Sequence, residues 1–182
     1  MIRKLLLALA GVLLALVLVV GIKTALTSSK QLTVEPAKPV AVDSAAAAER
    51  LGAAVRLKTI SSADDSELNG PEFLALHEHL RTSFPKAHAV LKRELVGKFG
   101  LLYTWPGSDP KAKPIALMAH QDVVPIAPGT EGDWQQPPFS GAIADGYVWG
   151  RGAWDDKGSL MSIMEAVNCS PPRASSRARR ST

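Results

Sequence analysis

An uninterrupted apolar run near the amino terminus restricts what this 182-residue chain can fold into more than any other feature of its sequence. The run extends from Leu5 to Ile22, holds no charged residue and is dominated by Leu, Val and Ala. As a helix it would be about 27 Å long, close to the ~30 Å hydrocarbon core of a bilayer. The sequence therefore predicts a transmembrane helix at residues 5–22 behind a cytoplasmic start at residues 1–4, and leaves room for one ordinary domain.

Two alternatives to an uncleaved signal anchor stay open. A cleaved signal peptide usually has a shorter apolar core followed by a small-x-small site, and residues 21–25 offer no good one. A buried core helix would need a polar face, which the run lacks. Because Arg3 and Lys4 precede the run while Lys23 and Lys30 follow it, the charge bias that sets orientation is modest. We expect a single-pass membrane protein with its domain on the non-cytoplasmic side, the alternative being secretion after signal cleavage.

The overall charge gives no sign of nucleic-acid binding. The formal charge is +4, but residues 169–182 hold four arginines and no acid, so the rest of the chain has 4 − 4 = 0. A nucleic-acid interface needs basic residues clustered on a folded surface, and we expect neither that nor a specific protein partner. The single cysteine, Cys169, excludes an internal disulfide and an all-cysteine metal site. Metal ligands would therefore have to be His, Asp or Glu.

Composition divides the remaining chain into a linker, a domain and a tail. Residues 23–43 mix Thr, Ser, Lys and Pro without periodicity, which is typical of a linker. Residues 44–167 carry helix and strand patterns and are expected to form the domain. Residues 168–182 contain no aliphatic side chain larger than Ala, and we expect a disordered basic tail whose composition resembles translation in a shifted reading frame.

Three helices are expected in the domain. Asp43 or Ser44 can cap the first, which should end near residue 58. Pro71 suits the first turn of the second. The third should begin near Ser159. The expected apolar residues are Phe73, Leu74, Leu76 and Leu80 in the second helix, and Leu160, Ile163, Met164 and Val167 in the third.

Strand patterns alternate with these helices. Residues 89–95 and 100–105 are strand-like, and residues 142–149 predict a hairpin that turns at the dipeptide Asp145-Gly146. Residues 114–119 are uniformly apolar, which predicts a strand buried on both faces of an α/β sheet. His120 follows that strand directly, and ligands of open α/β sheets bind at the carboxyl ends of strands.

Two groups of polar residues could carry chemistry. His120 and Asp122 are two apart, a spacing that places both side chains on one side of a strand, and a carboxylate beside a metal-binding imidazole fixes its tautomer. Asp155 and Asp156 stand in a glycine-flanked loop directly before a helix. Taken alone, each group has an ordinary explanation, because His-x-Asp is frequent and acidic residues stabilise helix amino termini.

Three sequence elements occur in order between Met118 and Glu165. They are HQDVVP at residues 120–125, WQQPPFSG at residues 134–141 and GRGAWDDKG at residues 150–158. Their order and spacing closely resemble the zinc-binding core of the metallopeptidase family that contains carboxypeptidase S, aminoacylases, fatty-acyl amino acid hydrolases and succinyl-diaminopimelate desuccinylases. The resemblance covers about residues 45–167.

The resemblance implies a fold, a cofactor and roles for three residues. The fold is an α/β zinc-peptidase domain of the three-layer, phosphorylase/hydrolase-like type. The cofactor is a pair of zinc ions, with His120 binding one, Asp155 bridging both and Asp122 orienting His120. The implied reaction is hydrolysis of an amide bond next to a free carboxylate, in a peptide or an N-acyl amino acid. The peptide between Asp155 and Asp156 is implied to be cis.

The sequence departs from the family pattern after the third element. Family members carry a Glu-Glu pair there, then a further acidic ligand, a late histidine and an inserted lid and dimerisation domain. None is expected here, since Glu165 is too early and solitary for that pair. We therefore expect a partial domain that is inactive in this form. The alternative is a non-catalytic, membrane-tethered binding or interaction protein.

The remaining histidines are expected to have surface or packing roles. His77 and His79 are two apart on a predicted helix and so point in different directions. His88 is placed at the start of a strand and has no partner in the sequence.

Overall fold

The computed structural model describes residues 1–31, 33–36, 40–61, 69–107 and 109–169. The tail from residue 170 onward, expected from its composition to be disordered, lies outside the described residues. The chain divides into two compact units, Met1–Val40 and Ala41–Thr182.

The first unit contains one long apolar helix. Helix α1 spans Ile2–Leu26, so it is longer at both ends than the predicted run, and none of its residues is buried. Its mean hydropathy and length are sufficient to cross a membrane, a property that signal sequences share.

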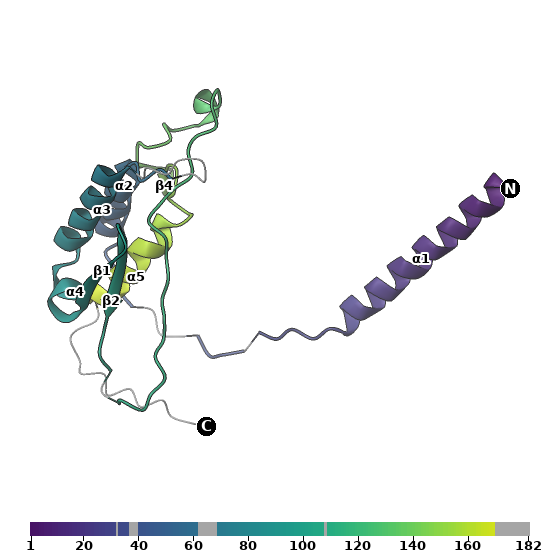
Figure 1. The fold of residues 1–182 in the computed structure, drawn as a ribbon, viewed down its shortest axis with the longest axis horizontal. Helices are drawn as coiled ribbons and strands as arrows, with labels where there is room; N and C mark the ends of the chain where they lie inside the picture. The colour runs from purple at the N-terminus through teal and green to yellow at the C-terminus, as the bar shows by residue number, and fades with distance from the viewer. Residues whose placement is uncertain (32, 37–39, 62–68, 108, 170–182) are drawn as a thin grey trace. The chain divides into compact units, whose positions relative to one another are not determined.

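Among its described residues, the second unit contains four α-helices. They are α2 (Ser44–Arg56), α3 (Gly70–Ser83), the short α4 (Pro85–Val90) and α5 (Lys157–Cys169). Asp43 caps α2 as expected, because its carboxylate accepts from the amide of Ala46 at 3.0 Å. Helix α5 begins two residues before Ser159 and continues to Cys169. Figure 1 shows α2, α3 and α4 along the left of this unit, with α5 to their right.

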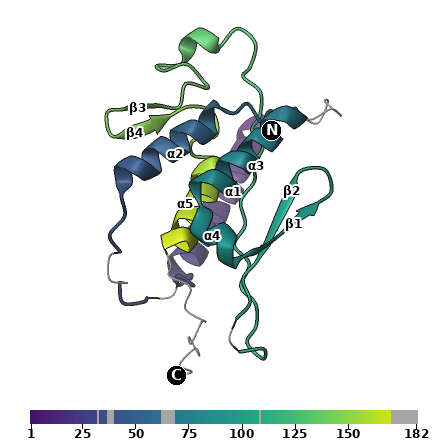
Figure 2. The same ribbon diagram turned by 90° about the vertical axis from the view of Figure 1, so that its left-hand side faces the viewer.

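Two separate antiparallel hairpins accompany the helices. Strands β1 (Lys92–Val96) and β2 (Gly100–Thr104) form one, and β3 (Ala142–Ala144) and β4 (Tyr147–Trp149) form the other. A 3-10 turn, η1 (Glu131–Asp133), precedes the second hairpin. Figure 2 shows the hairpins apart from one another, with the helices between them.

The second hairpin turns where the sequence predicted. Asp145 and Gly146 both have positive φ, 53° and 80°, as a type I′ turn requires. The first hairpin corrects one prediction. Residues 85–90 form α4, so the strand expected at 89–95 begins only at Lys92 and continues to Val96. His88 therefore lies in a helix and not at the start of a strand. Pro85 explains the difference, since proline favours the first turn of a helix.

The strand predicted at residues 114–119 is wrong for this structure. The segment has no assigned strand, and Ile115, Leu117 and Met118 are 71%, 66% and 85% exposed. A strand buried on both faces obtains its backbone hydrogen bonds from neighbouring strands, and among the described residues none pairs with this segment. The apolar side chains of this segment are therefore exposed instead of contributing to the core.

The core lies where α2, α3, α4 and α5 meet. Its fully buried apolar residues are Ala54, Leu76, Leu80, Phe84, Ala87, Met161 and Met164. Leu160 and Val167 pack on this cluster as expected, whereas Leu74, expected on the apolar side of its helix, is 57% exposed. Asn168 also joins the unit, because its Oδ1 accepts from the amides of Lys86 and Ala87 at 3.0 and 3.1 Å and so caps α4.

Candidate metal centre

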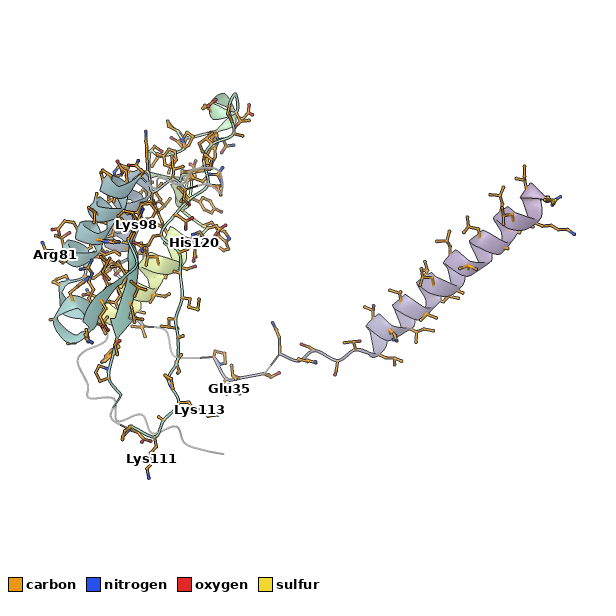
Figure 3. All side chains as sticks on the ribbon, viewed as in Figure 1. Glu35, Arg81, Lys98, Lys111, Lys113 and His120 are labelled. Carbon is orange, nitrogen blue, oxygen red and sulfur yellow. The ribbon has the colours of Figure 1, made fainter. Side chains whose placement is uncertain are left out.

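His120 lies between two carboxylates. Its Nε2 is 2.9 Å from Oδ1 of Asp155, and its Nδ1 is 2.9 Å from the carbonyl oxygen of Asp122 and 3.1 Å from Oδ1 of the same residue. Figure 3 labels His120, which lies on the extended segment beside α5. His120 and Asp122 were expected to lie on one side of a strand because they are two residues apart. Their side chains do lie together, although the backbone that carries them is not a strand.

Asp155 and Asp156 lie in the turn that leads into α5. The peptide bond between them is cis, as the family resemblance implied. The amide of His120 donates to Oδ2 of Asp156 at 3.1 Å, so the second aspartate joins the turn to the segment that carries the histidine. Asp155 is left with its carboxylate directed at the imidazole and 83% exposed.

The local charges shift two pKa values in opposite directions. The hydrogen bond that His120 donates to Asp155 raises the pKa of His120 above its ordinary value, and the contacts with Asp122 add to that effect. The pKa of Asp156 is lowered, first by a hydrogen bond from Ser159 and then by the amide of His120. In the metal-free protein, the imidazole of His120 is thereby favoured in its charged form between the two carboxylates.

Residues 59–61 form hydrogen bonds with residues 121–123, next to His120. The sequence did not predict these contacts. Thr59 Oγ1 donates to the carbonyl of Gln121 at 2.6 Å, and Ser61 Oγ donates to Oδ2 of Asp122 at 2.5 Å. Ile60 and Val123 form an isolated parallel bridge between the two segments. A serine and a threonine after a helix give no local sequence signal for this role, because their partners lie about sixty residues away.

His77 holds the same segment from the other side. Its Nε2 lies 2.8 Å from Oε1 of Gln121 and 3.1 Å from the carbonyl of Phe99. Both neighbours are acceptors, so Nε2 carries the proton. Desolvation lowers the pKa of His77 below its ordinary value, outweighing the contact with Gln121. The packing role expected for His77 is correct, but its contact with the residue between His120 and Asp122 was not anticipated.

Lys157 anchors the turn that carries Asp155. Its side chain is fully buried, and its Nζ donates to the carbonyls of Ala54 and Leu57 at 2.9 and 2.6 Å. These carbonyls belong to the last turn of α2 and the residue after it, where helices leave backbone acceptors without partners. Burial lowers the pKa of Lys157 to about 8. The lysine therefore ties the start of α5 to the end of α2.

A pocket beside His120 adjoins a larger pocket lined by aromatic side chains. One of about 210 Å³ is lined by His120, Asp122, Asp155, Arg151, Trp134 and Trp154 among others. A larger one of about 650 Å³ shares both tryptophans and adds Tyr147 and Trp149. The polar and the aromatic surfaces are thus continuous.

The donor chemistry fits zinc, although the set is incomplete. An imidazole nitrogen and a carboxylate oxygen 2.9 Å apart are both zinc ligands in type, and Asp122 engages the other ring nitrogen in the way that supports a metal-binding histidine. A zinc site needs four ligands as a rule, and among the described residues no group of three or more His, Cys, Asp or Glu could hold a metal ion. The described residues therefore offer donor atoms of the right type for at most part of a zinc coordination shell.

The folded unit combines helices and strands, and one of its pockets is lined by His120, Asp122 and Asp155. Imidazole and carboxylate groups are the side chains that metal-dependent hydrolases use as ligands. Comparison with known proteins agrees. Residues 116–173 match the model of peptidase family M20/M25/M40, and the chain belongs to this family, among carboxypeptidase S-like members. The family is described as one of peptidases, which are hydrolases.

Three relatives illustrate the similarity. The chain is 44% identical over 167 residues to the probable carboxypeptidase S-like 2 of Dictyostelium discoideum, covering 87% of this chain and 31% of that protein. It is 45% identical to carboxypeptidase S of Saccharomyces cerevisiae, covering 65% and 22%. It is 40% identical to an N-fatty-acyl-amino acid synthase/hydrolase of Mus musculus, covering 69% and 26%. The chain thus spans less than a third of the length of these relatives.

Proposed function

We propose that this chain provides the amino-terminal, zinc-binding portion of a hydrolase that cleaves an amide bond next to a free carboxylate, in peptides or N-acyl amino acids. The observation that carries the proposal is the placement of His120, whose two ring nitrogens are engaged by Asp155 and Asp122. Carboxypeptidase and N-fatty-acyl-amino acid hydrolase names among the relatives support this substrate class.

The proposed roles follow from the contacts. His120 would bind one zinc ion through Nε2, and Asp155 would bridge two ions through its exposed carboxylate. Asp122 holds the tautomer of His120 through Nδ1 and is itself fixed by Ser61. Zinc, when bound, polarises the scissile carbonyl and lowers the pKa of the attacking water. The protein groups orient these ligands, which is the part of the chemistry that the described residues supply.

We further infer that the 182-residue polypeptide alone does not hydrolyse amides at a measurable rate. The described residues supply two zinc donors, and within them no carboxylate stands beside those donors as a separate general base, since Asp122 and Asp156 are both engaged. A two-metal site with so few ligands binds its ions weakly. Zinc-dependent amidase activity of the purified chain would contradict this inference.

A chimera tests the hydrolase assignment. Residues 116–167 of this chain replace the matching segment of the Saccharomyces cerevisiae carboxypeptidase S, and release of a carboxyl-terminal amino acid from a peptide is measured together with zinc content. We expect an active chimera that Asp155→Asn inactivates, while Asp145→Asn in the β3–β4 turn leaves it active. A folded chimera that contains zinc but has no activity would favour the non-catalytic, membrane-tethered alternative.

We also propose that α1 is an uncleaved signal anchor that places the folded unit on the non-cytoplasmic side. Support comes from its length, its exposure along the whole helix and the lack of a small-x-small site after it. The test is extraction of membranes with alkaline carbonate, combined with sequencing of the mature amino terminus. A soluble product that begins after residue 22 would show cleavage instead.

A further inference from the structure

Among the described arginines of the folded unit, Arg151 is the one that is partly buried without an acidic partner. Arg50 pairs with Glu165 at 2.5 Å, and Arg81 pairs with Glu78 at 2.5 Å on the surface. Arg56 and Arg93 are exposed, so water can solvate their charges. Arg151 is half-buried, and the part of the chain that the structure describes offers its guanidinium neither an ion pair nor a hydrogen bond.

The guanidinium of Arg151 is held in a defined position. It lies over the ring of Trp134, with its Cζ 5.1 Å from the ring centroid, and stacking of this kind fixes an arginine plane. The backbone amide of Arg151 donates to the carbonyl of Pro138 at 2.6 Å. Its Nε is buried without an acceptor. A positioned, partly desolvated cation without a counter-ion is a strong binding site for an anion.

The surroundings of Arg151 indicate which anion. The residue lines the pocket of about 210 Å³ that also holds His120 and Asp155, so an anion there would lie beside the candidate metal ligands. Asp122 and Asp155, the carboxylates of that pocket, form no ion pair with Arg151, because both are hydrogen-bonded to His120. In an N-acyl amino acid, only the amide nitrogen and the α-carbon separate the scissile carbonyl from the carboxylate. A protein that binds such a substrate therefore has to contact the scissile carbonyl and the carboxylate at two neighbouring positions.

The larger pocket defines the rest of the ligand. It holds about 650 Å³ and is lined by four aromatic side chains, Trp134, Tyr147, Trp149 and Trp154. Trp154 is 92% exposed and borders both pockets, so an apolar group attached to the anion would reach an aromatic surface. The combination suits a carboxylate that carries an aromatic or aliphatic substituent better than a bare inorganic anion.

We propose that Arg151 binds the free carboxylate of the substrate, and that the adjoining aromatic pocket accepts its apolar side chain. The proposal rests on the proposed function for the identity of the substrate, but the binding itself needs neither metal nor turnover. Arg151 thus selects amino-acid substrates with a free carboxylate over their amides and esters. It acts as a binding residue and takes no part in proton transfer.

The test is equilibrium binding to the metal-free, full-length chain in non-ionic detergent, followed by tryptophan emission, since three of the four tryptophans line the pocket. The probes are N-acetyl-L-phenylalanine and N-acetyl-L-phenylalaninamide, which differ only in the carboxylate. We expect the acid to bind about tenfold more tightly than the amide. Equal affinities would overturn the proposal without the need for any variant.

Variants then assign the effect to the residue. Arg151→Gln should bring the acid-to-amide ratio close to one, whereas the control Arg81→Gln, at an arginine outside the pocket (Figure 3), should keep it about tenfold. A ratio that survives in Arg151→Gln, or phosphate that displaces the acid at equal concentration, would contradict the proposal. If the chimera with carboxypeptidase S is inactive but this chain still prefers N-acetyl-L-phenylalanine to its amide, only the proposed hydrolase function is contradicted.

Discussion

Replacing His77 by leucine tests whether the supports of the His120 segment determine stability. His77 is 6% exposed, and its Nε2 lies within hydrogen-bond distance of Gln121 and Phe99. Leucine fills similar space but leaves the Oε1 of Gln121 without its donor. An orphaned, partly buried acceptor costs about 1–3 kcal/mol. We therefore expect His77→Leu to lower the free energy of unfolding by that amount at pH 7.

The pH dependence gives a second, independent signature. Burial lowers the pKa values of both His77 and His79 below 6.5, so the folded state resists protonation that the unfolded state accepts. The unfolded chain then binds more protons, and stability falls as the pH drops below 6.5. His120 has the opposite effect, because its raised pKa lets the folded state hold a proton that the unfolded state releases above pH 6.5. The wild type and His77→Leu share this gain as the pH falls from 7.5, so it cancels in their comparison.

The assay is denaturant unfolding of the full chain in detergent at pH 7.5 and pH 5, followed by tryptophan emission. The loss of stability between these two values should be smaller in His77→Leu than in the wild type, because one of the two depressed groups is gone. The matched control is His88→Leu, since His88 bonds only to the carbonyl of Phe84 and the hydroxyl of Tyr103, away from the candidate metal centre. An unchanged pH dependence in His77→Leu would refute the reasoning.

Three further substitutions probe other parts of the structure. Asp43→Ala removes the cap of α2 and should cost about 1 kcal/mol in denaturant unfolding. Leu80→Ala creates a cavity at a fully buried position and should cost about 2–5 kcal/mol in the same assay, and a cost below 1 kcal/mol would show that the core is placed wrongly. Ser61→Ala frees Asp122 on one side and should weaken zinc binding about tenfold, measured with a competing chelator, without a comparable loss of stability.

Local signals in the sequence predicted the parts of the fold that depend on neighbouring residues. The cap at Asp43, the helix start at Pro71 and the turn at Asp145-Gly146 all came from short-range chemistry, and the structure has each of them. The strand at residues 114–119 failed for the opposite reason. A buried strand is defined by its neighbours in a sheet, and an apolar sequence cannot form one where the described residues supply no pairing partner.

The candidate site shows the same division. The three expected residues His120, Asp122 and Asp155 lie together, and they were found because they form a recognisable motif. Ser61 and Lys157 were missed as supports because their contacts connect segments that are about sixty and one hundred residues apart in the chain. Such long-range hydrogen bonds leave no periodic pattern in the sequence, so only the folded structure reveals them.

The measurement that tests the central claim most directly is zinc binding by the full-length, metal-free chain, titrated against a fluorescent chelator. We expect the wild type to bind zinc saturably. The affinity should weaken at least about tenfold in the double variant His120→Asn and Asp155→Asn, and should be unchanged in the control Asp145→Asn. Equal zinc affinity of the wild type and the double variant would contradict the assignment of these two residues as ligands.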